Sequence, residues 1–153
     1  MTRNQLTWIA MAGSAALLLG AFAFQYLGGL LPCVLCIYQR WPHAVAVLAG
    51  VLGLSLGGRA WLILGAVAAA TTSAIGLYHA GVELQLWEGL ATCTVDTMKG
   101  LNTADLLNTD ITLGAPVRCD AVPWALFGIS MAGWNALVSA GLSVIWIGAA
   151  RQK

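Results

Sequence analysis

The segment Leu31–Arg40 contains two cysteines and a cation at the junction of two long apolar segments. Cys33 and Cys36, three residues apart, are able to close as a disulfide or to act as a pair of thiols. If Cys36 begins a helix, the helix N-terminus stabilises its thiolate and lowers its pKa. Arg40 follows Cys36 by four residues, so in a helix both side chains lie on one face. A positive charge there favours a thiolate or a reduced, oxyanionic ligand.

Two further cysteines lie in the polar stretch 81–131, which also contains all six acidic residues. Cys93 is near its start and Cys119 near its end. Loops of this length without strong structure are usually functional or disordered, and this one is long enough to bring its cysteines to the first pair. Within it, Thr103–Leu107 is compatible with a short capped helix. Val122–Phe127 is apolar but too short to span a membrane, so we expect it to lie on the membrane surface.

The composition identifies an integral membrane protein. Hydrophobic residues make up 59% of the chain and charged residues 8%, whereas soluble domains contain about 25% charged residues. The mean hydropathy is +0.82. At 153 residues the chain has the length of one domain, so we expect a single domain over 1–153. A net charge of +1 gives no reason to expect nucleic acid as a partner.

Four apolar segments approach the roughly 20 residues that a helix needs to cross a bilayer. The sequence therefore predicts an all-α fold, a bundle of four transmembrane helices. Their expected bounds are about 6–27, 41–57, 60–80 and 132–150. The second is the shortest and has Pro42 near its start. Because proline favours an extended residue before it, Trp41 is a possible break that would separate Cys36 from the face of Arg40.

The cations predict the orientation. Four of the seven, Arg3, Arg59, Arg151 and Lys153, lie in three very short segments, which we expect on the cytoplasmic side together with both termini. Loops 28–40 and 81–131 then lie outside, and all four cysteines occupy a compartment that permits disulfides. A signal peptide cleaved after Ala21–Ala23 is the alternative for the first segment. The apolar run continues to Leu31, longer than a signal core needs, and cleavage would leave the cysteines on the same side.

These features together resemble the DsbB family of bacterial disulfide-bond oxidases over nearly the whole chain. The resemblance rests on Pro32–Tyr38, on Arg40, on the second cysteine pair in the long outer loop, and on the segment Trp124–Trp134 after Cys119. A lone Cys-x-x-Cys is a weak signal. Its place between the first and second spans, with another pair between the third and fourth, is specific.

The resemblance implies a relay of thiol–disulfide exchange. Cys93 and Cys119 would form the disulfide offered to a reduced, DsbA-like periplasmic protein of the thioredoxin fold. The thiolate of that partner would attack Cys93. The released Cys119 would either resolve this intermediate or attack Cys33, which leaves Cys36 as the thiolate. The protein would then lie in the bacterial inner membrane, with its redox cysteines on the periplasmic side.

The resemblance also implies an electron acceptor, a membrane quinone such as ubiquinone or menaquinone, facing Cys36. Arg40 corresponds to the quinone-site arginine of the family, where it would stabilise the Cys36 thiolate and the charge developing on the quinone oxygen. His79, at the outer end of the third span, is a candidate second quinone-site group. Read alone, Arg40 is equally an interfacial cation, and His79 and His43 are interfacial histidines.

Three other interpretations compete with the relay. The nearest is a quinone reductase similar to vitamin K epoxide reductase, although that family carries its Cys-x-x-Cys within a late span. A second is a non-catalytic membrane scaffold in which Cys93 and Cys119 only staple a loop. The third is a zinc site, which the unpaired spacing of the outer cysteines disfavours, so no metal is expected. Thiol trapping separates a scaffold from a relay, because only a relay accumulates reduced thiols without quinone.

Overall fold

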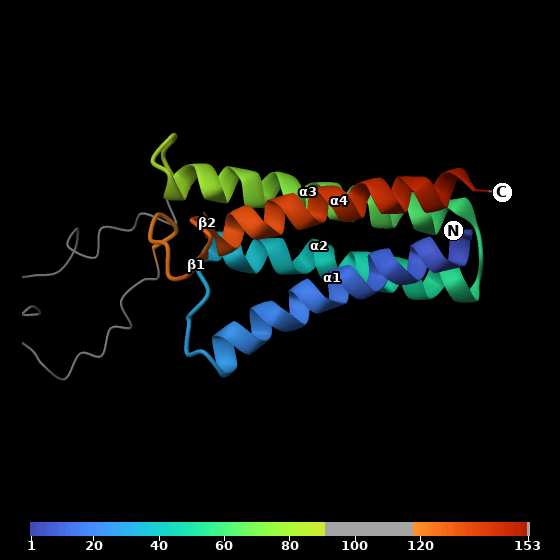
Figure 1. The fold of residues 1–153 in the computed structure, drawn as a ribbon, viewed down its shortest axis with the longest axis horizontal. Helices are drawn as coiled ribbons and strands as arrows, with labels where there is room; N and C mark the ends of the chain where they lie inside the picture. The colour runs from blue at the N-terminus through green and yellow to red at the C-terminus, as the bar shows by residue number, and fades with distance from the viewer. Residues whose placement is uncertain (91–117, 153) are drawn as a thin grey trace, which may run out of the picture.

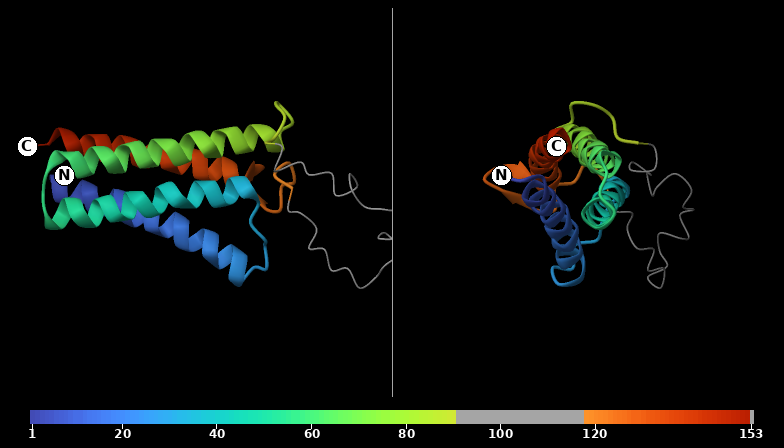
Figure 2. Two further views of the ribbon diagram at one scale, coloured as in Figure 1. Left: turned by 180° about the vertical axis from the view of Figure 1, so that it is seen from behind. Right: turned by 90° about the vertical axis from the view of Figure 1, so that its right-hand side faces the viewer.

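In the part of the chain that the structure describes, four helices run side by side along one long axis (Figure 1). The computed structural model describes residues 1–90 and 118–152. The elements are α1 (Arg3–Tyr26), α2 (Val34–Ser55), α3 (Arg59–Glu83), β1 (Ala125–Leu126), β2 (Ile129–Ser130) and α4 (Met131–Arg151). The prediction of an all-α fold is thus confirmed, apart from one two-stranded antiparallel hairpin. At the cysteine end, α1 leans away from the other helices (Figures 1 and 2).

Three of the described helices, α1, α3 and α4, are long and apolar enough to cross a membrane. This confirms the prediction of a membrane protein. Of the four predicted spans, the structure supports these three. Although α2 has 22 residues, its N-terminal half contains Gln39, Arg40 and His43, which lower its hydropathy.

Helix α2 begins at Val34, well before the predicted start at 41. Cys33 is its N-cap, and the Cys33 sulfur accepts a hydrogen bond from the backbone N–H of Cys36 at 3.2 Å. The helix continues through Pro42, so the expectation that Trp41 could be extended is wrong. Proline costs the helix one backbone hydrogen bond but does not end it here. Cys36 and Arg40 therefore lie one turn apart on a continuous helix.

Small residues allow α3 and α4 to pack closely. A Cβ atom added to Gly65 would lie 2.8 Å from the ring of Trp146, and one added to Gly76 would lie 3.0 Å from the backbone nitrogen of Ala136. Trp146 is fully buried in the main hydrophobic cluster, together with Leu62 and Ala69. Such close approach is typical of helix association in membranes, where van der Waals packing replaces the hydrophobic effect.

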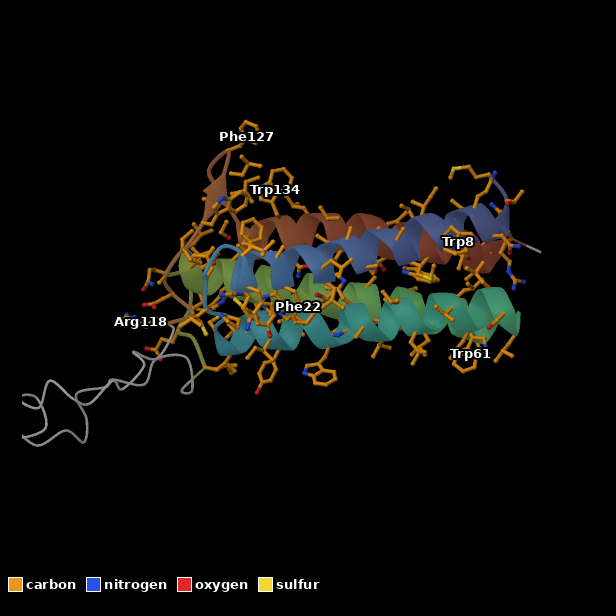
Figure 3. The ribbon with its side chains drawn as sticks, turned by 90° about the horizontal axis from the view of Figure 1, so that it is seen from below. Trp8, Phe22, Trp61, Arg118, Phe127 and Trp134 are labelled. Atoms are coloured by element: carbon orange, nitrogen blue, oxygen red, sulfur yellow. The ribbon has the colours of Figure 1, made fainter. Side chains whose placement is uncertain are left out.

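The two ends of the bundle differ. Both termini lie at the end that holds the turn between α2 and α3 (Figure 2). In that turn Gly57 and Gly58 have φ of 71° and 92°, a region that favours glycine. Trp8 and Trp61 lie toward the same end, and Trp134 and Phe127 toward the other (Figure 3).

The second half of the segment Val122–Phe127, which the sequence predicts to lie on a membrane surface, belongs to the β1–β2 hairpin. Its two turn residues, Phe127 and Gly128, both have positive φ, as a tight two-residue hairpin requires. The ring of Phe127 projects from the tip (Figure 3). The predictions for Cys93 and for a helix at Thr103–Leu107 lie outside the described residues.

Candidate functional site

The first cysteine pair is a pair of free thiols at the start of α2. The Cys33 and Cys36 sulfurs are 2.9 Å apart, whereas a disulfide bond measures about 2.05 Å. Cys33 is buried, and Cys36 is partly exposed. Because Cys33 caps the helix and Cys36 lies in its first turn, the local fold alone brings the two sulfurs into contact.

The local environment shifts the pKa values of the two thiols in opposite directions. Cys36 lies in the first turn of α2, before the apolar half of the helix. The pKa of its thiol is lowered to about 7, chiefly by the hydrogen bond from the Cys33 thiol and also by the charge of Arg40. Burial opposes this shift. The hydrogen bond to Cys36, together with burial, raises the pKa of Cys33. Near neutral pH, Cys36 is therefore the thiol of the pair that ionises, and Cys33 keeps its proton.

Cys119 lies against this pair. It is fully buried, packs in one cluster with Cys33, Leu35 and Val82, and is disulfide-bonded. The fold thus places a disulfide sulfur from the segment before the hairpin beside the thiols of α2. Cys93, the remaining cysteine of the sequence, is not among the described residues.

His79 contacts both Cys33 and Cys119. Its Nε2 atom is 3.6 Å from the Cys33 sulfur, and its ring also hydrogen-bonds the backbone of Cys119. The carboxylate of Glu83, one turn later on α3, has an oxygen 3.8 Å from the same Nε2. Both side chains are buried. The structure therefore brings the sequence-predicted His79 to Cys33.

Arg40 faces α1. Its guanidinium donates to Gln25 Oε1 at 2.5 Å and to the carbonyl of Ala21 at 3.3 Å. The same group lies 5.0 Å from the centre of the Phe22 ring, within the range of a cation–π contact. Its Nε atom is buried and has no hydrogen-bond partner among the described residues. The charge is thus held between α1 and α2 with one donor unused.

A cavity of about 310 Å³ separates α1 from α2 and α4 at this end. It is lined mostly by apolar side chains. Its polar lining residues are Cys33, Cys36, Gln39, Arg40, His43, His79, Glu83, Arg118 and Asn135. A larger and more open hollow of about 930 Å³ lies at the opposite end, lined by Met1, Arg3, Gly57 and Gln152 among others. The described residues that line it include no cysteine or histidine, so the cavity beside Cys36 is the one relevant to thiol chemistry.

A buried polar network extends from the cysteines into the bundle, and it was not predicted from the sequence. Its members on α2, α3 and α4 are Gln39, His43, Thr72, His79, Asn135 and Ser139. Asn135 donates to Gln39 Oε1 at 2.7 Å, and its own Oδ1 lies 2.8 Å from His43 Nε2. Polar residues within otherwise apolar segments were the available signal, because membrane interiors tolerate such groups mainly where they serve structure or function.

Comparison with known proteins assigns the chain to a family. The model of the family described as "Disulfide bond formation protein DsbB" matches residues 3–149. A protein named "Disulfide bond formation protein B" from Shewanella sp. (strain W3-18-1) is 31% identical, over 94% of this chain and 85% of its own length. Proteins of the same name from Paracidovorax citrulli and Methylococcus capsulatus are each 33% identical, over 87% and 84% of this chain and 78% and 82% of their own lengths. No solved structure matches the chain.

Proposed function

Because this chain belongs to the DsbB family of disulfide bond formation proteins, we propose that it reoxidises a periplasmic dithiol protein of the thioredoxin fold and passes the electrons to a membrane quinone. One observation carries the proposal. A free thiol pair lies between a disulfide-bonded cysteine on one side and an apolar, arginine-containing cavity on the other. A scaffold with two structural disulfides has no need for such an arrangement.

The proposal includes four transmembrane helices in the bacterial inner membrane, with residues from about 41 onward in α2 as the additional span. In the bundle α2 lies between α1 and α3 and runs parallel to their length (Figure 1). Arg3, Arg59 and Arg151 lie at the end of the bundle that holds the termini, and short cation-rich segments remain in the cytoplasm. The cysteines at the opposite end then face the periplasm, where disulfides persist.

The electron path proceeds through exchange of disulfide bonds. The partner's thiolate attacks Cys93, which breaks the Cys93–Cys119 bond and releases Cys119 as a thiolate. Cys119 then attacks Cys33 of an oxidised Cys33–Cys36 pair, and the electron pair of that bond leaves on Cys36. The burial of Cys119 against Cys33 supports this second step. The lowered pKa of Cys36 supports its role as the leaving thiolate.

The residues around the cavity fit a quinone. Its walls are mostly apolar, and its volume of about 310 Å³ lies within the range of ligand sites. The Nε donor of Arg40, which has no partner among the described residues, is buried at its edge. Arg40 would bind a quinone oxygen, Phe24 and Trp124, whose rings contact each other, would line the ring site, and Cys36 would supply the electrons. A bound quinone supplies the capacity to accept two electrons and two protons. Ubiquinone and menaquinone both meet these requirements.

The proposal is tested by mixing the purified, oxidised protein anaerobically with a reduced thioredoxin-fold dithiol protein and ubiquinone-1, and following the quinone absorbance. We expect one quinone reduced per partner disulfide formed. Cys33→Ala and Cys93→Ala are expected to abolish turnover. Reduction of the quinone without oxidation of the partner would indicate a different quinone reductase. Partner and quinone that both remain unchanged would indicate a scaffold.

A further inference from the structure

Two side-chain amides of the buried network have orientations fixed by backbone carbonyls. The Gln39 amide nitrogen lies 3.2 Å from the carbonyl oxygen of Leu35, and the Asn135 amide nitrogen lies 3.4 Å from that of Thr72. Since a carbonyl only accepts hydrogen bonds, the NH₂ groups must face these oxygens. The 2.7 Å bond from Asn135 Nδ2 to Gln39 Oε1 agrees with both orientations.

These orientations determine which nitrogen of His79 carries the proton. The second hydrogen of the Gln39 NH₂ group is directed at His79 Nδ1, 2.9 Å away. Nδ1 therefore accepts, and in the neutral ring the proton lies on Nε2. Nε2 is the atom that faces the Cys33 sulfur at 3.6 Å. This distance suits a hydrogen bond to sulfur, whose radius exceeds that of oxygen.

We propose that His79 acts in the exchange between the two cysteine pairs, by donating its Nε2–H to the thiolate of Cys33, and that Gln39 is the positioning residue that holds the donor tautomer. The inference rests on the relay proposed above. It differs from the quinone-site role that the family resemblance implies for His79. The His79 ring also hydrogen-bonds the backbone of Cys119. Because the neutral ring has one N–H, this proton is shared between that backbone and the Cys33 sulfur, where the two pairs meet.

His79 assists the last step of the exchange, in which the Cys33–Cys119 disulfide is broken. After Cys119 has attacked Cys33, a mixed Cys33–Cys119 disulfide exists. The second thiolate of the partner attacks the partner sulfur of the partner–Cys93 bond, so the partner's disulfide forms and Cys93 leaves as a thiolate. This thiolate attacks the Cys119 sulfur, the Cys93–Cys119 bond forms, and the Cys33–Cys119 bond breaks. Its electron pair leaves on Cys33 as a thiolate, which accepts the hydrogen bond from His79, and no proton is transferred. Hydrogen bonds to charged acceptors are about twice as strong as neutral ones, so the donor assists most when Cys33 leaves.

The same atoms also resemble a metal site. The donor atoms of Cys33, Cys36 and His79 lie within 4.8 Å of one another. A histidine binds a metal through a nitrogen lone pair, however, and the tautomer fixed by Gln39 turns an N–H toward the sulfurs. The geometry therefore favours hydrogen-bond donation over metal coordination.

The tautomer is tested directly by nitrogen NMR on ¹⁵N-histidine-labelled protein in detergent. We expect His79 to be in the neutral form with its proton on Nε2. The Nε2 signal should change when the Cys33–Cys36 pair is oxidised and reduced. In Gln39→Met, which lacks the amide donor, a mixture of tautomers is expected. A wild-type His79 with its proton on Nδ1, or binding of Zn²⁺ that shifts Nε2 at equimolar metal, would overturn the inference.

The role in exchange is tested without quinone. Oxidised protein is mixed with the reduced partner, quenched with acid and alkylated, and the decay of the Cys33–Cys119 species is followed. His79→Leu should slow this decay by about ten- to a hundredfold, the usual effect of losing a hydrogen bond to a charged group. His79→Gln, which can present an N–H at a similar place, should recover part of the rate. In a separate steady-state assay with quinone, the KM for quinone should stay near the wild-type value in both variants.

Ser73→Ala is the matched control, because it removes a hydrogen bond from α3 to the carbonyl of Ala136 without touching the sulfurs. It should leave the exchange rate unchanged. If His79→Leu raises the KM for quinone and leaves the exchange rate unaltered, the inference is wrong and the quinone-site role holds. Wild-type protein that exchanges disulfides with the partner but never reduces quinone refutes the proposed function instead. If His79→Leu does not fold, His79→Gln and the NMR assignment decide.

Discussion

At the level of single residues, the chemistry depends on making two neighbouring thiols unequal. The Cys33 sulfur accepts a hydrogen bond from the backbone N–H of Cys36, and its own S–H donates to the Cys36 sulfur. The two sulfurs therefore share one thiol proton. Spacing showed only that Cys36 and Arg40 would share a face if a helix began at Cys36, and the expected span began at about 41. It did not predict that the capping group is itself a sulfur, because cysteine is not among the residues preferred at that position.

The pKa of Cys36 is the first quantity to measure. In the reduced protein, the rate of Cys36 alkylation should rise with pH through a midpoint of about 7, since only the thiolate reacts. In Cys33→Ala the midpoint should move upward toward the ordinary value of 9.0, because the main hydrogen bond is lost. Cys33→Ser keeps an O–H donor and should titrate near the wild-type midpoint. Identical midpoints in all three proteins would show that Cys33 does not tune Cys36.

Arg40 is expected to determine quinone affinity. Arg40→Met removes the charge and the buried Nε donor, and the KM for ubiquinone-1 should rise about tenfold or more, as for the loss of one charged hydrogen bond. Gln25→Ala keeps the charge but removes the 2.5 Å contact that holds it, so a smaller rise is expected. Steady-state kinetics at saturating partner measures both. Unchanged quinone kinetics in Arg40→Met would exclude this residue from the quinone site.

At the level of elements, hydropathy predicted where the helices lie but not how far they extend. The apolar segments located α1, α3 and α4 to within a few residues. The start of α2 was predicted seven residues late, because Gln39, Arg40 and His43 resemble a loop in a hydropathy profile. Each finds a partner on another helix, and those partners are 15 to 96 residues away in the sequence. Contacts at such separations leave no local pattern, so the sequence marks the polar residues in the apolar segments but does not show which of them bond to each other.

The packing of α3 against α4 should be sensitive to one methyl group. In Gly65→Ala the new Cβ would lie 2.8 Å from the buried ring of Trp146, and overpacking of this kind typically costs about 1–3 kcal/mol. A Cβ added to Gly141 on α4 would meet no neighbouring side chain within 4 Å, so Gly141→Ala is the matched control and should not reduce stability. Denaturant unfolding in detergent compares the free energies of unfolding. Equal free energies of unfolding of the two variants would show that α3 and α4 move apart to accommodate the methyl group without a loss of stability.

At the level of the whole molecule, the two ends of the bundle hold different chemistry. The end with the termini contains Arg3, Arg59 and Arg151, and the other contains Cys33, Cys36 and Cys119. The sequence predicted this division from the positions of cations and cysteines. The family resemblance implied that Cys119 reaches Cys33, but no rule of spacing fixes where a segment of that length ends, and the structure shows Cys119 packed against Cys33.

The orientation of the bundle is the last prediction. In cells whose outer membrane has been permeabilised, a membrane-impermeant maleimide should label Cys36 after reduction. A cysteine placed at Gln152 in a cysteine-free variant should react only after the inner membrane is also broken, because the positive-inside rule retains that end in the cytoplasm. Thr2→Cys in the same background is the matched control and should behave like Gln152→Cys, since both termini lie at one end of the bundle. If α2 did not cross the membrane, three spans would separate the termini, and one of these two positions, but not both, would be labelled while the inner membrane is intact.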